Sequence, residues 1–331
     1  MSEPLLAVED LHVGFHTEDG LVRAVDGLSL ELAPGEILAV VGESGCGKSV
    51  AAQTIMGLTR AGNAEFRGSV RFRGRDLLTA SNEELRRVRG AEIAMVFQDP
   101  MSSLNPVHRI GDQIVEQILA HERLSRAEAR ERADDLLERV GISRAGERAD
   151  SYPHELSGGM RQRVMIAMAL SCGPAVLLAD EPTTALDVTV QAQILERIRE
   201  LRDAENAAVV LVTHDLGVVA DIADRIVVMY AGRIIEQGTP EEIFYDPQHP
   251  YTWGLLGSIA RVDRPRSGRL AAIPGRPPSL ASPPAGCHFR PRCPHEFERC
   301  SETPPLEARL PEAPGHCDRC WLAPSEKRSN R

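Results

Sequence analysis

The chain has 331 residues, 42% of them hydrophobic but only 4% aromatic, so it can bury a core built mainly from aliphatic side chains. Its formal net charge of −10 argues against general nucleic-acid binding, which depends on Lys and Arg neutralising phosphates. No stretch approaches the roughly 20 apolar residues of a membrane-spanning helix, and the acidic segment Met1–Asp10 does not fit a signal peptide. We therefore expect a cytosolic protein that has no nucleic-acid partner and reaches the membrane through other subunits.

The first 240 or so residues have the pattern of one α/β domain. Leu5–Phe15 and Val22–Leu32 are predicted strands, and the break between them at Thr17–Gly20 predicts a hairpin. Ile37–Val41 is a short apolar strand, and Ser49–Gly57 is predicted to be a helix.

The loop between this strand and this helix fits the phosphate-binding pattern. Glycines let backbone N–H groups turn toward phosphates, and the helix N-terminus adds positive potential. Lys48 is expected to reach the β- and γ-phosphates, and the Ser49 hydroxyl to bind Mg²⁺. The sequence therefore predicts a site for ATP or GTP. The loop runs Gly42-Glu43-Ser44-Gly45-Cys46-Gly47-Lys48-Ser49, and its predicted nucleotide-binding residues are Gly42, Ser44, Gly45, Cys46, Gly47, Lys48 and Ser49.

The middle of the chain is helical in character. Arg126–Val140 has apolar residues at helical spacing with charges between them, which is typical of an exposed amphipathic helix. We expect a helical insertion over about residues 99–170. Short apolar strands resume at Ala175–Ala179 and Ala207–Val212, and this alternation predicts a parallel sheet with helices on both faces. A closing hairpin is predicted at residues 226–236.

Two carboxylates follow the strand at Ala175–Ala179. The carboxyl end of such a strand is where ligands bind in open α/β sheets. Asp180 is expected to hold Mg²⁺, and Glu181 to act as general base on the attacking water. As helix caps alone, two adjacent acids would be redundant.

Several further motifs give the chain a resemblance to the ATPases of ABC transporters. Leu156–Gln162, with Ser157, Gly158 and Gly159, is similar to the signature sequence of that family. Gln98 resembles its Q-loop glutamine, Asp187 its D-loop aspartate, His214 its switch histidine and Phe15 its adenine-stacking aromatic. The resemblance covers residues 5–240. It implies that Gln98 and His214 join Glu181 in catalysis, and that Gln98 also binds Mg²⁺.

The resemblance further implies a dimer. In this family Ser157, Gly158 and Gly159 contact the γ-phosphate held by a partner subunit, with Asp187 nearby, so that two subunits enclose two ATP molecules. ATP closes the pair and hydrolysis reopens it, which is a two-state element driven by its ligand. The helical insertion would face the membrane subunits.

The end of the chain resembles the C-terminal region of dipeptide and oligopeptide importer ATPases. The similarity lies in Gly286–Pro294, in the later cysteines and in His249-Pro250-Tyr251-Thr252. In that subfamily such cysteines can carry a four-iron four-sulfur (4Fe-4S) cluster, and thiolates are its natural ligands. The match implies Cys287, Cys293, Cys300 and Cys320 as ligands, with Cys317 as the alternative fourth. A zinc site and a cysteine cluster without metal remain open.

The sequence thus predicts an α/β, ABC-type P-loop ATPase with a mixed β sheet, a helical insertion subdomain and a small cysteine-rich C-terminal extension. We place the ATPase domain at 1–245 and the extension at 246–331. The resemblance implies ATP and Mg²⁺, two transmembrane permease subunits, a second ATPase subunit of different sequence and an extracytoplasmic substrate-binding protein. The chain would lie peripherally on the cytoplasmic face of the membrane. Nickel chelates or oligosaccharides are alternative cargoes, and an ABC ATPase without a transport role is the remaining alternative.

Overall fold

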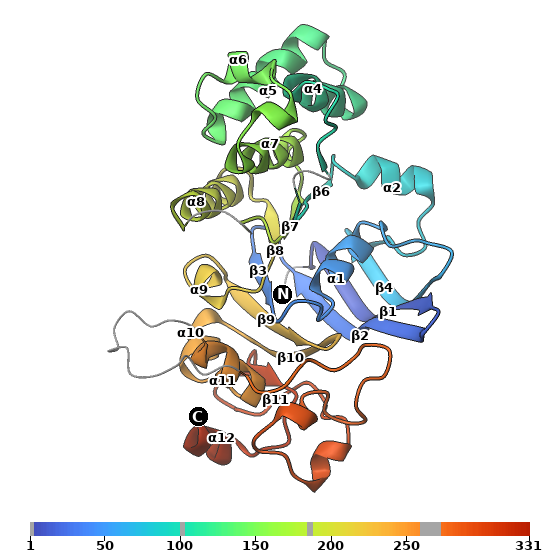
Figure 1. The fold of residues 1–331 in the computed structure, drawn as a ribbon, viewed down its shortest axis with the longest axis vertical. Helices are drawn as coiled ribbons and strands as arrows, with labels where there is room; N and C mark the ends of the chain where they lie inside the picture. Colours follow the sequence, from blue (N-terminus) through green and yellow to red (C-terminus); the bar gives the residue numbers. More distant parts are fainter. Residues whose placement is uncertain (1–2, 100–102, 184–187, 259–272) are drawn as a thin grey trace. The chain divides into compact units, whose positions relative to one another are not determined.

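The computed structural model describes residues 3–99, 103–183, 188–258 and 273–331 (Figure 1). The chain divides into two compact units, each made from separate stretches of sequence. Unit 1 comprises Met1–Leu5, Leu32–Glu36 and Thr79–Val212, and unit 2 comprises Leu6–Glu31, Ile37–Leu78 and Thr213–Arg331.

In unit 2, the first two strands form the predicted hairpin. They are β1 (Leu6–Thr17) and β2 (Gly20–Leu32), and they belong to a sheet of order β2-β1-β4-β5. The sequence analysis missed β4 (Ala64–Phe72), which pairs antiparallel with β1, and the short β5 (Arg75–Asp76). The burial pattern of β4 explains the omission, because exposed residues dominate its first half.

The second sheet of unit 2 is mixed, as predicted. β3 (Ile37–Val41) runs parallel to β9 (Arg225–Tyr230), whereas β9 pairs antiparallel with β10 (Arg233–Gly238). Beyond β10 lie β12 (Cys317–Asp318) and β11 (Glu307–Ala308), both antiparallel. The C-terminal segment therefore adds two strands to this sheet beyond β10. Helix α1 (Lys48–Ile55) follows β3, close to its predicted bounds.

Unit 1 contains three parallel strands in the order β8-β7-β6. They are β6 (Ile93–Val96), β7 (Val176–Asp180) and β8 (Ala208–Thr213), and all their residues are buried. Uninterrupted apolar runs of this length are what a strand covered on both faces requires. The sequence predicted β7 and β8 but not β6.

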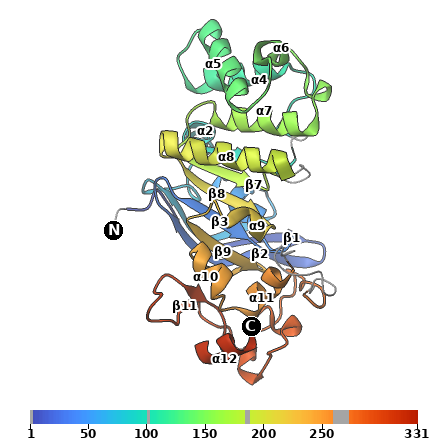
Figure 2. The ribbon, with the colours of Figure 1, turned by 90° about the vertical axis from the view of Figure 1, so that its left-hand side faces the viewer.

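The predicted helical stretch of unit 1 is present, and its helices gather together in both views (Figures 1 and 2). Helix α5 has a capping box in which Ser125 and Glu128 each bond the other's backbone, and it buries Ala129, Ala133, Leu136 and Leu137. Alternating spacings of this kind place one apolar stripe on a helix. The helices are α4 (Ile110–His121), α5 (Arg126–Arg139), α6 (Ala145–Ala149), the 3-10 turn η1 (Pro153–Glu155) and α7 (Gly158–Leu170), with α2 (Asn82–Val88) before them and α8 (Val188–Glu205) after them.

The remaining helices of unit 2 are short. Among the described residues, none of the helices combines the length and hydropathy that crossing a bilayer requires. They are α9 (Leu216–Val219), α10 (Pro240–Tyr245), α11 (Pro250–Gly257), the 3-10 turns η2 (Arg290–Arg292) and η3 (Glu298–Ser301), and α12 (Pro324–Asn330).

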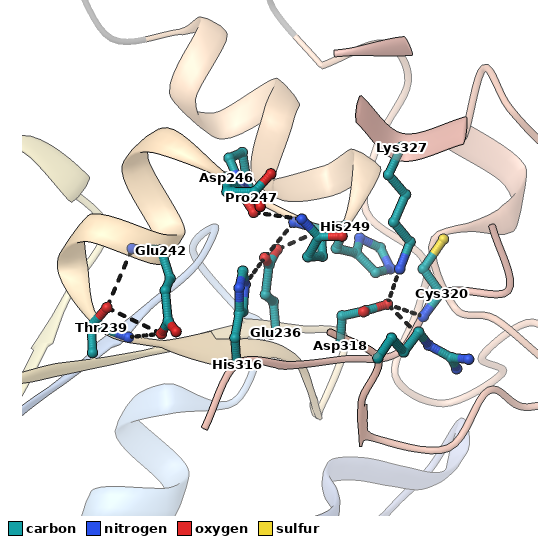
Figure 3. A network of polar contacts seen from close by, with 12 residues as sticks. Glu236, Thr239, Glu242, Asp246, Pro247, His249, His316, Asp318, Cys320 and Lys327 are labelled. Carbon is teal, nitrogen blue, oxygen red and sulfur yellow. Dashed lines mark hydrogen bonds and ion pairs between the residues drawn. The ribbon is translucent and has the colours of Figure 1, made fainter. Parts of the chain in front are cut away.

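A buried polar network fastens the C-terminal segment to β10 (Figure 3). The fully buried carboxylate of Glu236 accepts hydrogen bonds from the backbone N–H groups of Gln248 (2.5 Å) and His249 (3.0 Å). Its Oε1 also lies 2.8 Å from Nε2 of His316. A buried charge is stable only when it is paired and hydrogen-bonded, so Glu236 needs all three partners.

A second buried pair lies beside it. The Lys327 ammonium donates to Asp318 Oδ1 at 2.7 Å, and the backbone N–H of Cys320 donates to the same oxygen at 2.9 Å. Both side chains are almost completely buried. These contacts hold α12 and β12 together at the end of the chain.

His249 is buried as a neutral ring within this network. Burial, together with the nearby Lys327 charge, lowers the pKa of His249 from its ordinary 6.5 to about 3. Its Nδ1 accepts a hydrogen bond from the Tyr251 backbone N–H at 3.1 Å and so caps α11. Unfolding therefore frees a histidine that takes up a proton below pH 6.5, and the stability that neutral His249 provides is lost as pH falls from 6.5 toward 3.

We predict that His249→Asn makes the protein less sensitive to mild acid. Asparagine retains a side-chain cap acceptor but does not titrate. Between pH 7 and pH 5 the wild type should lose about 2 kcal/mol of unfolding free energy more than the variant, because one proton separates the two states. Urea unfolding at both pH values measures this difference, and equal losses in the two proteins would contradict the assignment.

Candidate functional site

The phosphate-binding loop of unit 2 packs its glycines directly against neighbouring backbone. A Cβ at Gly47 would lie 2.1 Å from the carbonyl oxygen of Ala24, and one at Gly42 would lie 2.2 Å from that of Met229. Gly47 also has a φ of 104°, which side chains rarely tolerate. Only glycine fits either position, so the sequence pattern reflects a steric requirement of the folded loop.

Lys48 begins α1 and turns back over this loop. Its side chain is almost fully buried, and Nζ donates to the carbonyl oxygens of Gly42 (2.7 Å) and Glu43 (3.0 Å). Ser49 follows in the first turn of the helix, half-buried. Cys46 is buried, and its burial raises the pKa of the thiol. A cation and a helix N-terminus thus stand on one glycine-rich loop, which is an arrangement suited to phosphate.

Two outer contacts brace the same loop. The Glu43 backbone N–H donates to the hydroxyl oxygen of Tyr251 at 2.8 Å. The Glu43 carboxylate pairs with both terminal nitrogens of Arg292, at 2.7 Å and 3.0 Å. Both partners come from the C-terminal part of the chain, and sequence reasoning did not assign either of them a role. No local pattern marks the pairing, since 249 residues separate Glu43 from Arg292.

The carboxylate predicted to hold Mg²⁺ and the one predicted to act as general base stand at the end of β7 in unit 1. Asp180 and Glu181 are both buried. The Gln98 side-chain amide donates to Oε2 of Glu181 at 3.0 Å, so the structure brings these two predicted residues together. Glu181 has a φ of 46°, an uncommon backbone for a residue with a side chain, and such outliers gather at functional sites.

The signature segment forms the start of α7. Ser157 caps this helix by accepting a hydrogen bond from the Met160 backbone N–H at 3.3 Å. Gly158 and Gly159 lie inside the first turn of this helix. The buried Gln162 side chain donates to the Pro182 carbonyl at 2.6 Å, which ties this helix to the residue after Glu181.

The other predicted residues are spread over the two units. Phe15 is half-buried on β1, and His214 is exposed just after β8. Asp187 lies outside the described residues. The phosphate-binding loop, Phe15 and His214 belong to unit 2, and Gln98, Asp180, Glu181 and the signature residues belong to unit 1.

Four of the five C-terminal cysteines line one pocket in unit 2. They are Cys287, Cys293, Cys300 and Cys320, and Phe289 and Trp321 line the pocket with them. Cys317 is not among the lining residues; it lies on β12, opposite Gln237 of β10. Burial raises the pKa of Cys293 to about 11 and that of Cys320 to about 12, which favours the protonated thiols.

Within the described part of the chain, no group of three or more His, Cys, Asp or Glu side chains is arranged to hold a metal ion. Thiols are the donor type that iron–sulfur clusters use, but the four cysteines that line this pocket do not form a metal site as the structure places them.

Comparison with known proteins identifies the family. A family profile described as ABC transporter matches residues 25–184, and one described as the C-terminal region of oligopeptide/dipeptide transporters matches residues 235–300. The chain is 51% identical to the dipeptide transport ATP-binding protein DppD of Bacillus subtilis, over 97% of this chain and 95% of that one. It is 52% identical to the oligopeptide transport ATP-binding protein OppD of Salmonella typhimurium, over 93% and 91%.

The chain belongs to the ABC transporter family.

Solved structures agree with this assignment. A dimeric structure of MJ0796, a bacterial ABC transporter cassette, has a TM-score of 0.65 and 27% identity and covers 71% of this chain and 98% of its own. The cbiO1 protein of Clostridium perfringens has a TM-score of 0.61 and 30% identity, with 74% and 92% covered. The fold is therefore that of an ABC ATPase with a mixed sheet, and the chain is an ATP hydrolase of that family.

Proposed function

We propose that this ABC ATPase powers the import of dipeptides or oligopeptides. The observation that carries the proposal is that relatives named as dipeptide and oligopeptide transport ATP-binding proteins share about half of their residues with it over nearly the whole length. The match to the C-terminal region of such transporters supports the same cargo class. The ATPase domain is proposed to span 1–245, with a helical insertion at 99–170, and a cysteine-rich extension is proposed to span 246–331.

The ATP site is proposed to use the residues that the motifs indicate. Lys48 and the amides of Gly42, Ser44, Gly45, Cys46 and Gly47 would hold the phosphates, and Phe15 would stack on adenine. Ser49, Asp180 and Gln98 would hold Mg²⁺, which offsets the charge that develops on the phosphates. Glu181 would accept a proton from the attacking water, with His214 beside the γ-phosphate.

A second ATPase subunit would complete each site. Ser157, Gly158, Gly159 and Asp187 would contact the nucleotide held by that partner, which we propose to be a different chain. The described geometry supports this role for Ser157 and Gly158, because they are exposed at the N-terminus of a 13-residue helix. The other partners would be two membrane-spanning permease subunits and an extracytoplasmic binding protein. The chain would lie peripherally on the cytoplasmic face of the membrane.

The cysteine pocket is proposed to hold a 4Fe-4S cluster on Cys287, Cys293, Cys300 and Cys320. The convergence of these four side chains on one pocket supports this set, and the position of Cys317 outside it favours Cys320 as the fourth ligand. When bound, such a cluster would crosslink turns that otherwise have little regular structure.

Peptide uptake is the direct test of the cargo. Proteoliposomes that contain the full transporter should accumulate labelled di- or oligopeptides in the presence of ATP and binding protein. The same transporter with Lys48→Ala should not, because the loop would lose its phosphate-binding cation. Uptake of nickel chelates or oligosaccharides with none of peptides would overturn the proposed cargo and leave the ATPase role intact.

We predict that Glu181→Gln separates binding from hydrolysis. The glutamine has the same size, and its oxygen can still accept from Gln98, but it cannot take a proton from water. ATP turnover should fall by about 10²-fold or more while binding of a fluorescent ATP analogue is retained. The matched control is Glu200→Gln on α8, which removes an exposed ion pair with Arg197. Undiminished turnover in Glu181→Gln would exclude the residue as the general base.

We predict that protein prepared without oxygen is brown and contains iron and acid-labile sulfide in equal amounts. Cys320→Ser should lose both, whereas the matched variant Cys317→Ser should keep them, because only Cys320 lines the pocket. Metal analysis and visible absorbance measure the outcome. Colourless wild-type protein that holds zinc, or no metal, would refute the cluster.

A further inference from the structure

The loop that carries Lys48 is held from outside by a single arginine of the C-terminal segment. The Arg292 side chain is only 5% exposed, and it contacts both Glu43 of the phosphate-binding loop and the backbone at Pro274. Its terminal nitrogens bind the two carboxylate oxygens of Glu43, and its Nε donates to the Pro274 carbonyl at 2.8 Å. A bidentate pair fixes orientation as well as distance, because the guanidinium and carboxylate planes must align.

Aromatic packing holds this arginine in place. Nη1 of Arg292 lies 3.2 Å from the Tyr230 hydroxyl, and the guanidinium stands over the Tyr230 ring. Tyr230 in turn packs against Tyr251 and Phe289, with ring centroids 4.6 Å and 5.3 Å apart. Hydrogen bonds to Glu43, above all, raise the pKa of Arg292 over its already high ordinary value, so its charge is permanent.

The cysteine pocket sets the position of the turn that carries Arg292. Backbone hydrogen bonds link Arg290 N–H to Cys287 C=O and Cys293 N–H to Arg290 C=O, so two pocket cysteines bracket the turn η2. Phe289 connects the cysteine pocket with the aromatic cluster around Arg292, since it lines the pocket and packs edge-on against Tyr251. The path from the pocket to the phosphate-binding loop therefore consists of adjacent, buried contacts.

We propose that Arg292 is a positioning residue for the phosphate-binding loop, acting through Glu43, so that the C-terminal segment sets the nucleotide affinity of the ATPase. Both backbone polar groups of Glu43 are hydrogen-bonded: its carbonyl oxygen accepts from the Lys48 ammonium, and its N–H donates to the Tyr251 hydroxyl. The ion pair with Arg292 fixes the side chain of the same residue. Loss of the arginine frees Glu43 to rotate, and the carbonyl that helps aim Lys48 moves with it. The inference rests on the proposed ATP site.

The test is a double-mutant cycle on Arg292→Gln and Glu43→Gln in the full chain, read out by titration with a fluorescent ATP analogue. Each single variant should raise the dissociation constant about tenfold, as expected when one partner of a partly buried charged pair is removed. The double variant should be no weaker than either single variant, because each acts through the other. At saturating ATP, turnover in the assembled transporter should remain near the wild-type value while KM rises.

The matched control is Arg290→Gln, which removes a more exposed arginine from the same turn. It should leave the dissociation constant unchanged, so that general damage to the turn is excluded as the cause. Arg292→Lys should restore part of the affinity, since it keeps the charge but not the bidentate geometry. Circular dichroism melts identify any variant that does not fold, and Glu43→Gln leaves Arg292 and its turn intact.

Wild-type affinity in a folded Arg292→Gln protein, or additive losses in the double variant, would overturn the positioning role. Failure of the proposed function gives a different result. In that case the wild-type protein itself would not bind the analogue, and Lys48→Ala would have no effect.

Discussion

Backbone carbonyl groups of Ala24 and Met229 lie so close to the phosphate-binding loop that Gly47 and Gly42 cannot carry side chains. This contact fixes the path of the loop, because any other path would leave a gap beneath it or force the carbonyls apart. Lys48 can then reach back over its own loop, and α1 starts at a defined point. The contacts of Glu43 with Tyr251 and Arg292 therefore act on a loop whose path is already restricted by these backbone carbonyls.

In unit 1, hydrogen bonds connect the elements that carry the predicted site residues. The signature helix α7 and the acidic end of β7 are joined by one buried hydrogen bond from Gln162 to Pro182, next to Glu181. The Gln98 side chain, which follows β6, donates a hydrogen bond to the Glu181 carboxylate. A buried carbonyl left without its donor costs about 1–3 kcal/mol, so α7 and β7 are energetically coupled rather than merely adjacent. Movement of the helix therefore changes the surroundings of Glu181 directly.

The parts of the fold that sequence predicted are those with local signals. Ile37–Val41 is wholly apolar and is followed by glycines, and the structure places β3 at those residues. Arg126–Val140 has a helical apolar stripe, and α5 occupies it almost to the residue. By contrast, many residues of β4 are exposed, so it lacks an apolar pattern. It is a strand because it pairs with β1, and the local sequence does not indicate that pairing.

The same distinction separates the site residues. Roles for Lys48, Glu181 and Ser157 could be predicted from motifs, because the chemistry expected of them requires neighbours at fixed spacing. Arg292 could not, although it stands one residue before a cysteine that the sequence did single out. Its function depends on Glu43, far away in the chain, and distant ion pairs leave no periodicity to read. The cysteines fall between these cases: their types suggested a shared site, and the folded chain shows that Cys320 lines the same pocket as Cys287, Cys293 and Cys300 whereas Cys317 does not.

The buried carboxylate of Glu236 has a consequence for the order in which the protein can be made. Its three partners are synthesised after it, and His316 follows it by 80 residues along the chain. Until that segment is made, the Glu236 carboxyl group lacks its His316 partner, so the buried polar network on β10 is incomplete. We infer that β10 reaches its final packing only after the segment that carries His316 and β12 has been synthesised.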